Sequence, residues 1–381
     1  ILSLIQLARL KKNDLRREYD LSDIDHTWFE VDYVARSYQN FKEANAIMDF
    51  TDLLELFVKE ADKLIPEFDL CVLDEAQDLS NLQWDIAHQL DKRSKKMYCA
   101  GDDDQAIYTW AGANVDQFIS LSGGVEVLEQ SYRIPSVIHK LAEGIATQIR
   151  NRFPKVYKPQ DKIGEIIRLH DVREIDMSTG SWLVMAQANY MLYDIAEELK
   201  SNGYLFEYKG ARSISDRLSN AINGWEQMRN GKAITPHAAR AIYSYMSGNG
   251  VRVKRGYKTI DCEDDDLLTL ERLQGEFGLL ATEDMIWHEA MDKMPNLDRA
   301  YITALLRRGE KFNAMPRIRL STIHGTKGGE AENVVVITDL TMSAMNSSSD
   351  DLHRLFYVAV TRTMERLFII EPDDYGRAYN L

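Results

Sequence analysis

The stretch DLCVLDEAQDLS, residues 69 to 80, holds a short apolar run that ends abruptly in acidic side chains. Such a run is typical of a buried strand in a parallel sheet, and parallel strands carry functional residues at their carboxyl ends. A second run, MYCAGD, follows at residues 97 to 102, and a helical pattern covers Leu82 to Leu90 between the two. Strand, helix and strand in this order predict a right-handed crossover unit of an α/β fold.

The same kind of apolar run returns in the second half of the chain, each time near a helical segment. This region predicts four further strands, WLVMAQ at 182–187, IRLSTIH at 318–324, NVVVITDL at 333–340 and RLFIIEP at 366–372. Residues from about 212 to 315 have helical periodicity and few β-branched runs, so we expect an inserted helical subdomain there.

The chain before the first strand is also predicted to be helical, from residue 1 to about residue 65. In MDFTDLLELFVKEADKLI, residues 48 to 65, apolar side chains recur at the three-to-four spacing of one buried helical stripe. Asp49 or Thr51 could cap this helix, because both side chains can accept a hydrogen bond from the first turn.

Composition excludes several classes of protein. The 381 residues can form about two to four domains, and 45% apolar with 28% charged residues excludes collagen-like and globally disordered chains. The longest apolar run, LFYVAV at residues 355 to 360, is far shorter than the ~20 residues of a membrane-spanning helix, so we expect no membrane partner. Cys71, Cys99 and Cys262 are too dispersed for a disulfide framework, which predicts inert buried thiols in a reducing compartment.

The charge balance is acidic, with 46 basic and 60 acidic residues and a net charge of −14. This balance normally argues against a nucleic-acid partner, because phosphate binding depends on lysine and arginine. A net charge is an average, however, and basic stretches at residues 92–96 and 150–162 are candidates for contact with a DNA backbone. The alternative for both stretches is an ordinary solvated face.

Asp74 and Glu75 stand side by side at the end of the first predicted strand. In this arrangement Asp74 could hold Mg²⁺ while Glu75 polarises a water molecule for attack on a γ-phosphate. The alternative is that the two acids only begin the loop after the strand.

A second polar segment, GDDDQAIYTWAGA at residues 101 to 113, follows the next predicted strand. Gln105 is an uncharged donor placed to sense a phosphate. Tyr108 and Trp110 are aromatic residues that could stack bases, at about 1–3 kcal/mol for each base.

Two arginines are candidates for stabilising the charge of a transferred phosphate. Arg133 lies in LEQSYRIP, residues 128 to 135, and Arg362 lies between an apolar helical run and the last predicted strand. A glycine-rich turn at residues 325 to 329 contains Lys327 and exposes backbone N–H groups to an anion.

These segments, in this order, resemble the UvrD/Rep/PcrA-like superfamily 1 helicases. The resemblance covers residues of about 45 to 140, 180 to 212 and 316 to 372, and six ordered motifs do not match by chance. The motifs are MDFTDLL, LDEAQD, GDDDQ with IY and WAGA, SYR, TIHGTKGGE and YVAVTR.

The resemblance implies the roles of individual residues at a nucleotide site. Asp74 is the Mg²⁺ ligand and Glu75 is the general base for the attacking water. Gln105 couples the γ-phosphate to the surface that grips the DNA strand. The remaining nucleotide contacts are Arg133 and Arg362 on the γ-phosphate, one from each lobe, Gly328 and Glu330 at the phosphates and ribose, and Tyr108 at the base.

The resemblance also implies a path for DNA. Trp110 faces the single strand, His324 and Thr322 lie at its backbone, and Asn189 contacts it from the second lobe. Ala111 and Gln187 stand where the family usually has arginine, which removes two expected contacts with the strand.

The fold implied is α/β, with two RecA-like parallel-sheet lobes of the P-loop NTPase type and an inserted helical subdomain. Residues 1–133 form the rest of an incomplete first lobe with a helical N-terminal part. Residues 134–211 and 316–381 form the second lobe, and residues 212–315 form the insertion.

The function implied is an ATP-dependent DNA helicase or translocase that uses ATP and Mg²⁺. It moves 3′ to 5′ on single-stranded DNA and unwinds duplexes at single-strand/double-strand junctions, in DNA repair or replication. We expect it in the cytoplasm of a bacterial or phage-infected cell, or at the nucleoid.

One departure from the family concerns the phosphate loop. No GxxxxGK[ST] segment occurs in the 381 residues, and the chain opens at Ile1 inside a helical pattern. We therefore expect that a preceding segment carries this loop and that the chain alone hydrolyses ATP poorly. The alternative is a catalytically dead, helicase-like scaffold that binds DNA or regulates a partner.

Overall fold

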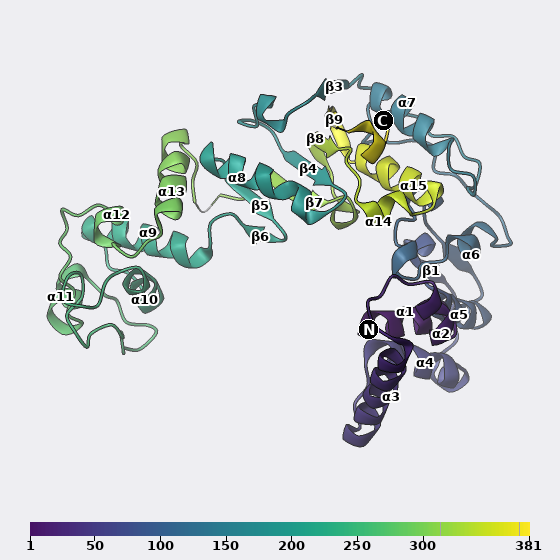
Figure 1. Cartoon of the computed structure of the whole chain (residues 1–381), viewed down its shortest axis with the longest axis horizontal. Coiled ribbons are helices and arrows are strands. Elements are labelled where there is room, and N and C mark those ends of the chain that lie inside the picture. Colours follow the sequence, from purple (N-terminus) through teal and green to yellow (C-terminus); the bar gives the residue numbers. More distant parts are fainter. Residues whose placement is uncertain (313, 373) are drawn as a thin grey trace.

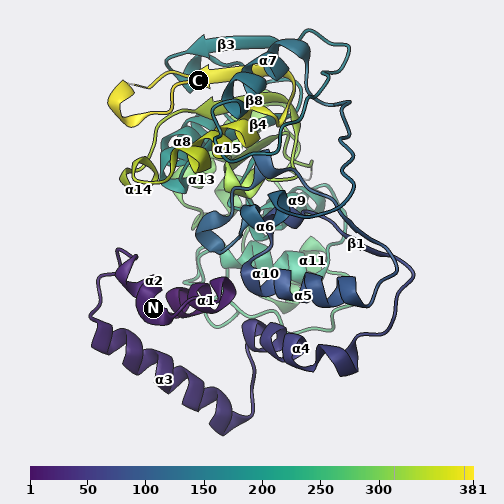
Figure 2. The same ribbon diagram turned by 90° about the vertical axis from the view of Figure 1, so that its right-hand side faces the viewer.

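The computed structural model describes residues 1–312, 314–372 and 374–381, and its strands form two separate sheets (Figure 1). The N-terminal part is helical, as predicted, and Figure 2 shows its helices gathered around the N-terminus. These helices are α1 (Leu2–Lys11), α2 (Leu15–Asp20), α3 (Trp28–Asn45) and α4 (Phe50–Leu64).

A two-stranded parallel sheet follows, made of β1 (Cys71–Leu73) and β2 (Met97–Cys99), with α5 (Asn81–Lys92) as the crossover helix. This confirms the predicted strand–helix–strand unit. Trp84 of α5 packs on one face of this sheet. The opposite face is exposed at Val72 and Tyr98, so the prediction of a fully buried strand is wrong for β1.

The second sheet has seven strands in the order β3-β9-β8-β4-β7-β5-β6, and its neighbours are parallel except for β5 and β6. The four strands predicted in this half are confirmed, while β3, β5 and β6 were not predicted. The strands are β3 (Glu165–Leu169), β4 (Trp182–Ala186), β5 (Phe206–Tyr208), β6 (Ala211–Arg212), β7 (Ile318–Thr322), β8 (Ala331–Ile337) and β9 (Thr363–Ile370).

Helices cover both faces of this sheet, as a parallel sheet requires. Leu183 and Met185 of β4 pack in the core shared with α7 (Ser136–Ala146) and α15 (Ser349–Val360). The alternate residues Trp182 and Val184 pack in the core shared with α8 (Tyr193–Ser201). The alternation of side chains along β4 therefore builds two separate hydrophobic layers.

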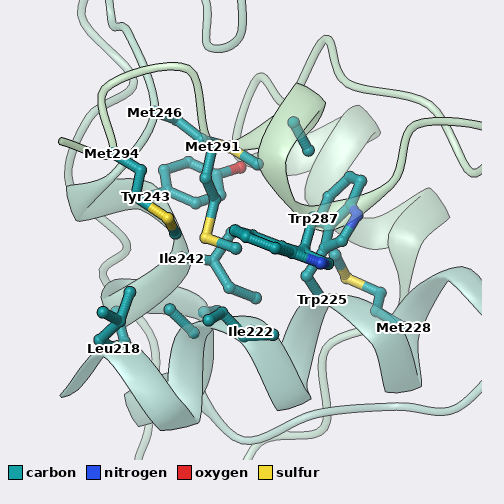
Figure 3. Packing of buried hydrophobic residues seen from close by; sticks show 14 of the residues in the cluster. Leu218, Ile222, Trp225, Met228, Ile242, Tyr243, Met246, Trp287, Met291 and Met294 are labelled. Carbon is teal, nitrogen blue, oxygen red and sulfur yellow. The ribbon is translucent and has the colours of Figure 1, made fainter. Parts of the chain in front are cut away.

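The helices between β6 and β7 have a hydrophobic core of their own, centred on Trp225 (Figure 3). The Trp225 indole is fully buried and donates a hydrogen bond to the carbonyl of Met285 at 2.9 Å. The helices are α9 (Asp216–Arg229), α10 (Pro236–Ser244), α11 (Leu270–Glu276), α12 (Trp287–Ala290) and α13 (Asn296–Arg308).

Short helical turns connect the larger elements. They are η1 (Ala76–Asp78), η2 (Asp103–Gln105), η3 (Thr109–Ala111), α6 (Val115–Ile119), η4 (Val172–Glu174), η5 (Asn189–Leu192), η6 (His324–Thr326), α14 (Met342–Met345) and η7 (Tyr375–Arg377). Among the described residues, no helix is long and apolar enough to cross a membrane. The three cysteines are free and only partly buried, so the prediction of buried thiols is wrong.

A charged cluster holds the N-terminal helices together. Asp49 caps α4, as one of the two predicted alternatives, and forms a capping box with Asp52. The buried ammonium of Lys42 lies 2.9 Å from the Asp49 carboxylate, and Arg9 also pairs with both acids. Burial alone would raise the pKa of Asp49, but hydrogen bonds from Lys42 and from the Asp52 N–H outweigh it and lower the pKa.

This cluster is expected to stabilise the N-terminal helices at neutral pH and to lose its effect in acid. Because the folded pKa of Asp49 lies below its unfolded value of about 3.9, the contribution is fully present above that pH and disappears as the pH falls further. Asp49→Asn should therefore flatten the acid limb of a stability-versus-pH curve followed by far-ultraviolet circular dichroism. Asp32→Asn, at an exposed pair with Arg36, is the control and should leave that limb unchanged. An unchanged limb in Asp49→Asn would contradict the assignment.

Candidate functional site

The carboxyl ends of β1 and β2 bring two polar segments to the same edge of their sheet. Gln77 joins these segments, because its buried side chain donates to the Glu75 carboxylate and accepts from the Asp102 N–H at 3.0 Å. A Cβ at Gly101 would lie 2.3 Å from Gln77 Oε1, so a larger residue there would displace the Gln77 side chain. The sequence analysis missed Gln77, although it lies only two residues after Glu75.

Glu75, the predicted general base, has a left-handed backbone with φ of 51°. A residue other than glycine in this region is strained by about 1–3 kcal/mol, and such strain concentrates at functional sites. The Glu75 N–H donates to the carboxylate of Asp74 at 2.9 Å, and both side chains are exposed. The turn after β1 therefore presents two carboxylates to solvent at the edge of the sheet.

A lysine from the seven-stranded sheet reaches this edge. Lys327, in the turn between β7 and β8, pairs with the carboxylate of Asp78 and lies 3.4 Å from that of Glu75. It also donates to the backbone carbonyl of Gln105 at 3.2 Å. Burial raises the pKa of Asp78, against the opposing effect of Lys327. Lys327 therefore connects the two sheets, a role that the sequence analysis did not assign.

Two arginines lie close to each other beside Gln105. The Arg362 side chain is only 1% exposed, and its Nη2 donates to Gln105 Oε1 at 2.8 Å. Burial, and next the nearby charge of Arg133, lower the pKa of Arg362 to about 10. Within the described residues no carboxylate lies at ion-pair distance from Arg362, whose other partners are backbone carbonyls and a hydroxyl. A buried cation without a counter-ion beside a second cation indicates a place for an anion.

Arg133 lies beside Glu330 and is attached to the seven-stranded sheet, because Ile134 packs in the core with Val360 and the Gln160 side chain donates to the carbonyls of both Arg133 and Met364. The prediction that Arg133 and Arg362 come one from each lobe is therefore wrong.

The Arg133 Nη1 lies 3.5 Å from the Glu330 carboxylate, while its buried Nε has no partner among the described residues. Gly328, two residues before Glu330, is exposed and has φ of 80°, a backbone conformation that glycine adopts with little strain. The structure thus brings together Gln105, Arg133, Arg362 and Glu330, as predicted, and their contacts with a nucleotide stay predictions.

Two basic side chains of the segment after α7 form ion pairs with the three aspartates that follow β2. The buried Lys155 ammonium lies 3.0 Å from Asp102 and 3.0 Å from Asp104, and it also pairs with Asp103. Arg152 donates two hydrogen bonds to Asp104, at 2.9 and 2.6 Å. The sequence makes residues 150–162 candidates either for contact with DNA or for a solvated face, and neither holds for these two side chains, because both pair with aspartates inside the protein.

Three of the predicted DNA and nucleotide contacts form one aromatic cluster. Tyr108, Trp110 and His324 have ring centroids 5.8 to 6.4 Å apart, and the Tyr108 hydroxyl donates to the His324 carbonyl at 3.0 Å. Burial lowers the pKa of His324, which keeps the ring neutral at pH 7. Trp110 is 64% exposed, so the cluster offers a stacking surface to solvent.

The remaining predicted residues lie at the carboxyl edge of the seven-stranded sheet. Thr322 ends β7 and its hydroxyl accepts from the Gly325 N–H at 3.2 Å. Asn189 begins η5 after β4, and its carbonyl accepts from the Tyr208 hydroxyl at 2.8 Å. Neither residue belongs to the aromatic cluster, and their contact with DNA stays a prediction.

A cavity of about 1170 Å³ lies beside β2 and is lined by Asp102, Gln105 and Arg133, among others. Its volume exceeds the roughly 300–1,000 Å³ of ordinary ligand pockets. Glu75 and Arg362 lie outside its lining. Within the described residues no group of three or more His, Cys, Asp or Glu could hold a metal. A magnesium ion held by one carboxylate, waters and phosphates would need only Asp74 from the protein.

Comparisons with known proteins agree with the motifs. Residues 3–125 match the UvrD/REP helicase N-terminal domain, and residues 317–370 match the UvrD-like helicase C-terminal domain. A probable DNA helicase II homolog of Rickettsia conorii is 27% identical over 252 residues, 63% of this chain and 37% of the relative. ATP-dependent DNA helicase PcrA of Bacillus subtilis is 30% identical over 159 residues, 38% of this chain and 21% of the relative.

DNA helicase II of Escherichia coli is 31% identical over 159 residues, 39% of this chain and 22% of the relative. The matches with these three relatives span 37% or less of each relative's length. The resemblance predicted from the motifs is confirmed, and this chain carries a UvrD/REP helicase N-terminal domain and a UvrD-like helicase C-terminal domain.

Proposed function

We propose that this chain is part of an ATP-dependent motor that moves along single-stranded DNA. The observation that carries the proposal is the buried Arg362, which has Gln105 and Arg133 beside it and no carboxylate partner among the described residues. Two guanidinium groups that converge in this way suit a highly charged anion such as a triphosphate. The names of the relatives, all DNA helicases, support the same function.

Within this proposal each residue has a chemical role. ATP supplies the γ-phosphoryl group, and Mg²⁺ neutralises its charge when held at Asp74. Glu75 takes a proton from the attacking water, while Arg133 and Arg362 stabilise the charge that develops on the phosphate. Asp74 and Glu75 follow a strand of the two-stranded sheet, whereas Arg133 and Arg362 are both attached to the seven-stranded sheet. All four therefore act on one phosphate only when the two sheets are closed together.

The motor would grip DNA at the edge next to this chemistry. Trp110 stacks on a base, while His324, Thr322 and Asn189 contact the strand. We propose two RecA-like lobes, residues 1–133 and residues 134–211 with 316–381, and an insertion at 212–315. The direction would be 3′ to 5′, with unwinding at junctions during DNA repair or replication, in the bacterial cytoplasm or at the nucleoid.

Trp110→Ala is expected to weaken binding of an oligothymidylate by about 1–3 kcal/mol, because one base loses its stacking partner. Nucleotide affinity should change less, since the ring contacts of Trp110 among the described residues are with Tyr108 and His324 and not with Arg133 or Arg362. Fluorescence anisotropy at fixed salt measures the DNA affinity. Phe29→Ala removes an aromatic ring of similar exposure, 72%, from α3 and serves as the matched control. Equal DNA affinities for the two variants would count against the stacking role.

The motor itself is tested by phosphate release with and without oligothymidylate. A polypeptide that joins this chain to a phosphate-binding loop should hydrolyse ATP faster when DNA is present, whereas the chain alone should be slow. The alternative function, a scaffold, predicts DNA binding with no effect of DNA on hydrolysis in either polypeptide. That result would reject the proposed motor.

A further inference from the structure

We propose that Tyr190 and Tyr193 form a second base-stacking site for single-stranded DNA, on the seven-stranded sheet. This inference rests on the proposed function, because it extends the DNA surface that begins at Trp110 and His324. It adds two contacts that neither the motifs nor the relatives' names assign.

The sheet topology places these tyrosines next to the turn that carries His324. β4 and β7 are neighbouring parallel strands, and their last paired residues are Ala186 and Thr322. Neighbouring strands lie about 4.8 Å apart, so the chain leaves both strands at nearly the same point. The backbone N–H of Ile323 donates to the carbonyl of Ala186 at 3.0 Å, which fixes this arrangement. The turns η5 and η6 therefore emerge side by side at one edge.

The two tyrosines point outward together while their neighbours anchor the turn. Leu192 is fully buried in the core under α8, and Met191 packs against the same core. Tyr190 and Tyr193 are 66% and 60% exposed. They stand three residues apart across the end of η5 and the start of α8, a spacing that places side chains on one face.

Neither ring is used by the protein itself. Among the described residues, neither tyrosine side chain makes a hydrogen bond or a ring contact, in contrast to Tyr108 and Tyr208, whose hydroxyls donate to backbone carbonyls. Single exposed rings are common on protein surfaces, whereas two unpartnered rings on one face form a paired apolar platform. Their flat π faces suit bases, which stack without regard to sequence.

The charges around this site favour stacking over phosphate pairing. Lys209 is exposed just after β5, and its ammonium lies 5.1 Å from the Tyr208 ring. Asp194 follows Tyr193 directly and is exposed, which disfavours a phosphate beside the second ring. The bases rather than the backbone of the strand are therefore expected against the two tyrosines.

The test compares the full chain with Tyr190→Ala, Tyr193→Ala and the double variant, by anisotropy of a labelled oligothymidylate over a range of salt concentrations. Each single variant should bind between about 5-fold and 150-fold more weakly, the effect of losing one stacked base. The slope of log affinity against log salt should stay as in the original chain, since no phosphate contact is lost. Tyr190→Trp keeps a stacking ring at this position and should therefore bind the oligothymidylate as tightly as the original chain does.

Two controls make the test specific. Tyr33→Ala removes a tyrosine of equal exposure, 61%, from α3 and should leave the affinity unchanged. Lys209→Ala should lower the magnitude of the salt slope by about one, which is the pattern of a lost phosphate contact that the tyrosine variants should not show.

The possible outcomes separate this inference from the proposed function. Unchanged affinity in the double variant, with weaker binding in Trp110→Ala, would overturn the second stacking site and leave the motor proposal standing. Weaker binding with a reduced salt slope would also overturn it, because that pattern belongs to a lost phosphate contact. No DNA binding by the original chain at any salt concentration would reject both.

Discussion

Lys155→Met should destabilise the folded chain by about 3–5 kcal/mol, the usual effect of removing one partner from a buried ion cluster. The Lys155 side chain is 5% exposed and pairs with Asp102, Asp103 and Asp104. Burial alone would lower the pKa of this lysine, but the three carboxylates outweigh it and raise the pKa. Methionine fills a similar volume, so the variant removes the charge and leaves three carboxylates crowded together.

Urea denaturation of the whole chain measures this loss of stability. Lys158→Met is the matched control, because Lys158 forms an exposed pair with Glu129 and its loss should change stability by less than about 1 kcal/mol. Asp103→Asn in the Lys155→Met background should recover part of the loss, since it removes one of the unpaired charges. A Lys155→Met variant as stable as the control would show that the aspartates find other partners.

Glu75→Gln is expected to lower the turnover number by about 10²–10⁴-fold, the range for losing a general base. The effect concerns a polypeptide in which this chain is joined to a phosphate-binding loop. Glutamine keeps the size of the side chain and can still contact Gln77, but it cannot take a proton from water. Phosphate release under saturating ATP and DNA measures the turnover, and a fluorescent nucleotide measures binding, which should be spared.

Asp69→Asn is the control for Glu75→Gln, because Asp69 lies just before the same strand and its side chain is 87% exposed. It should leave turnover unchanged. Normal turnover in Glu75→Gln would remove this residue from the role of base and would direct attention to Asp78, whose pKa is raised by burial.

The sequence was sufficient to predict the strands with strong local signals. β4, β7, β8 and β9 are apolar runs in a sheet covered on both faces, so burial leaves a clear pattern. β5 and β6 are two to three residues long and lie at the end of the sheet. Strands that short have too few residues for a periodic pattern, which is why they were missed.

The motifs predicted which residues belong to the candidate site, but they did not predict the ion pairs that join these segments to one another. Arg362 and Gln105 were expected at one site, and a hydrogen bond of 2.8 Å joins them across 257 positions. Lys327, Arg152 and Lys155 were not assigned to partners, because ion pairs over such long separations depend on tertiary packing. A basic stretch alone cannot show whether its side chains face solvent or a buried aspartate.

The segment from Gln105 to Trp110 is held from the seven-stranded sheet at both of its ends, by Arg362 at one and by His324 at the other. Under the proposed function, one end senses the nucleotide and the other senses the strand, with four residues between them. Thermodynamic linkage then imposes a reciprocal effect: whatever factor DNA contributes to nucleotide affinity, the nucleotide must contribute to DNA affinity. Because this short segment is held at both ends, a titration with either ligand should show an affinity that depends on whether the other ligand is bound.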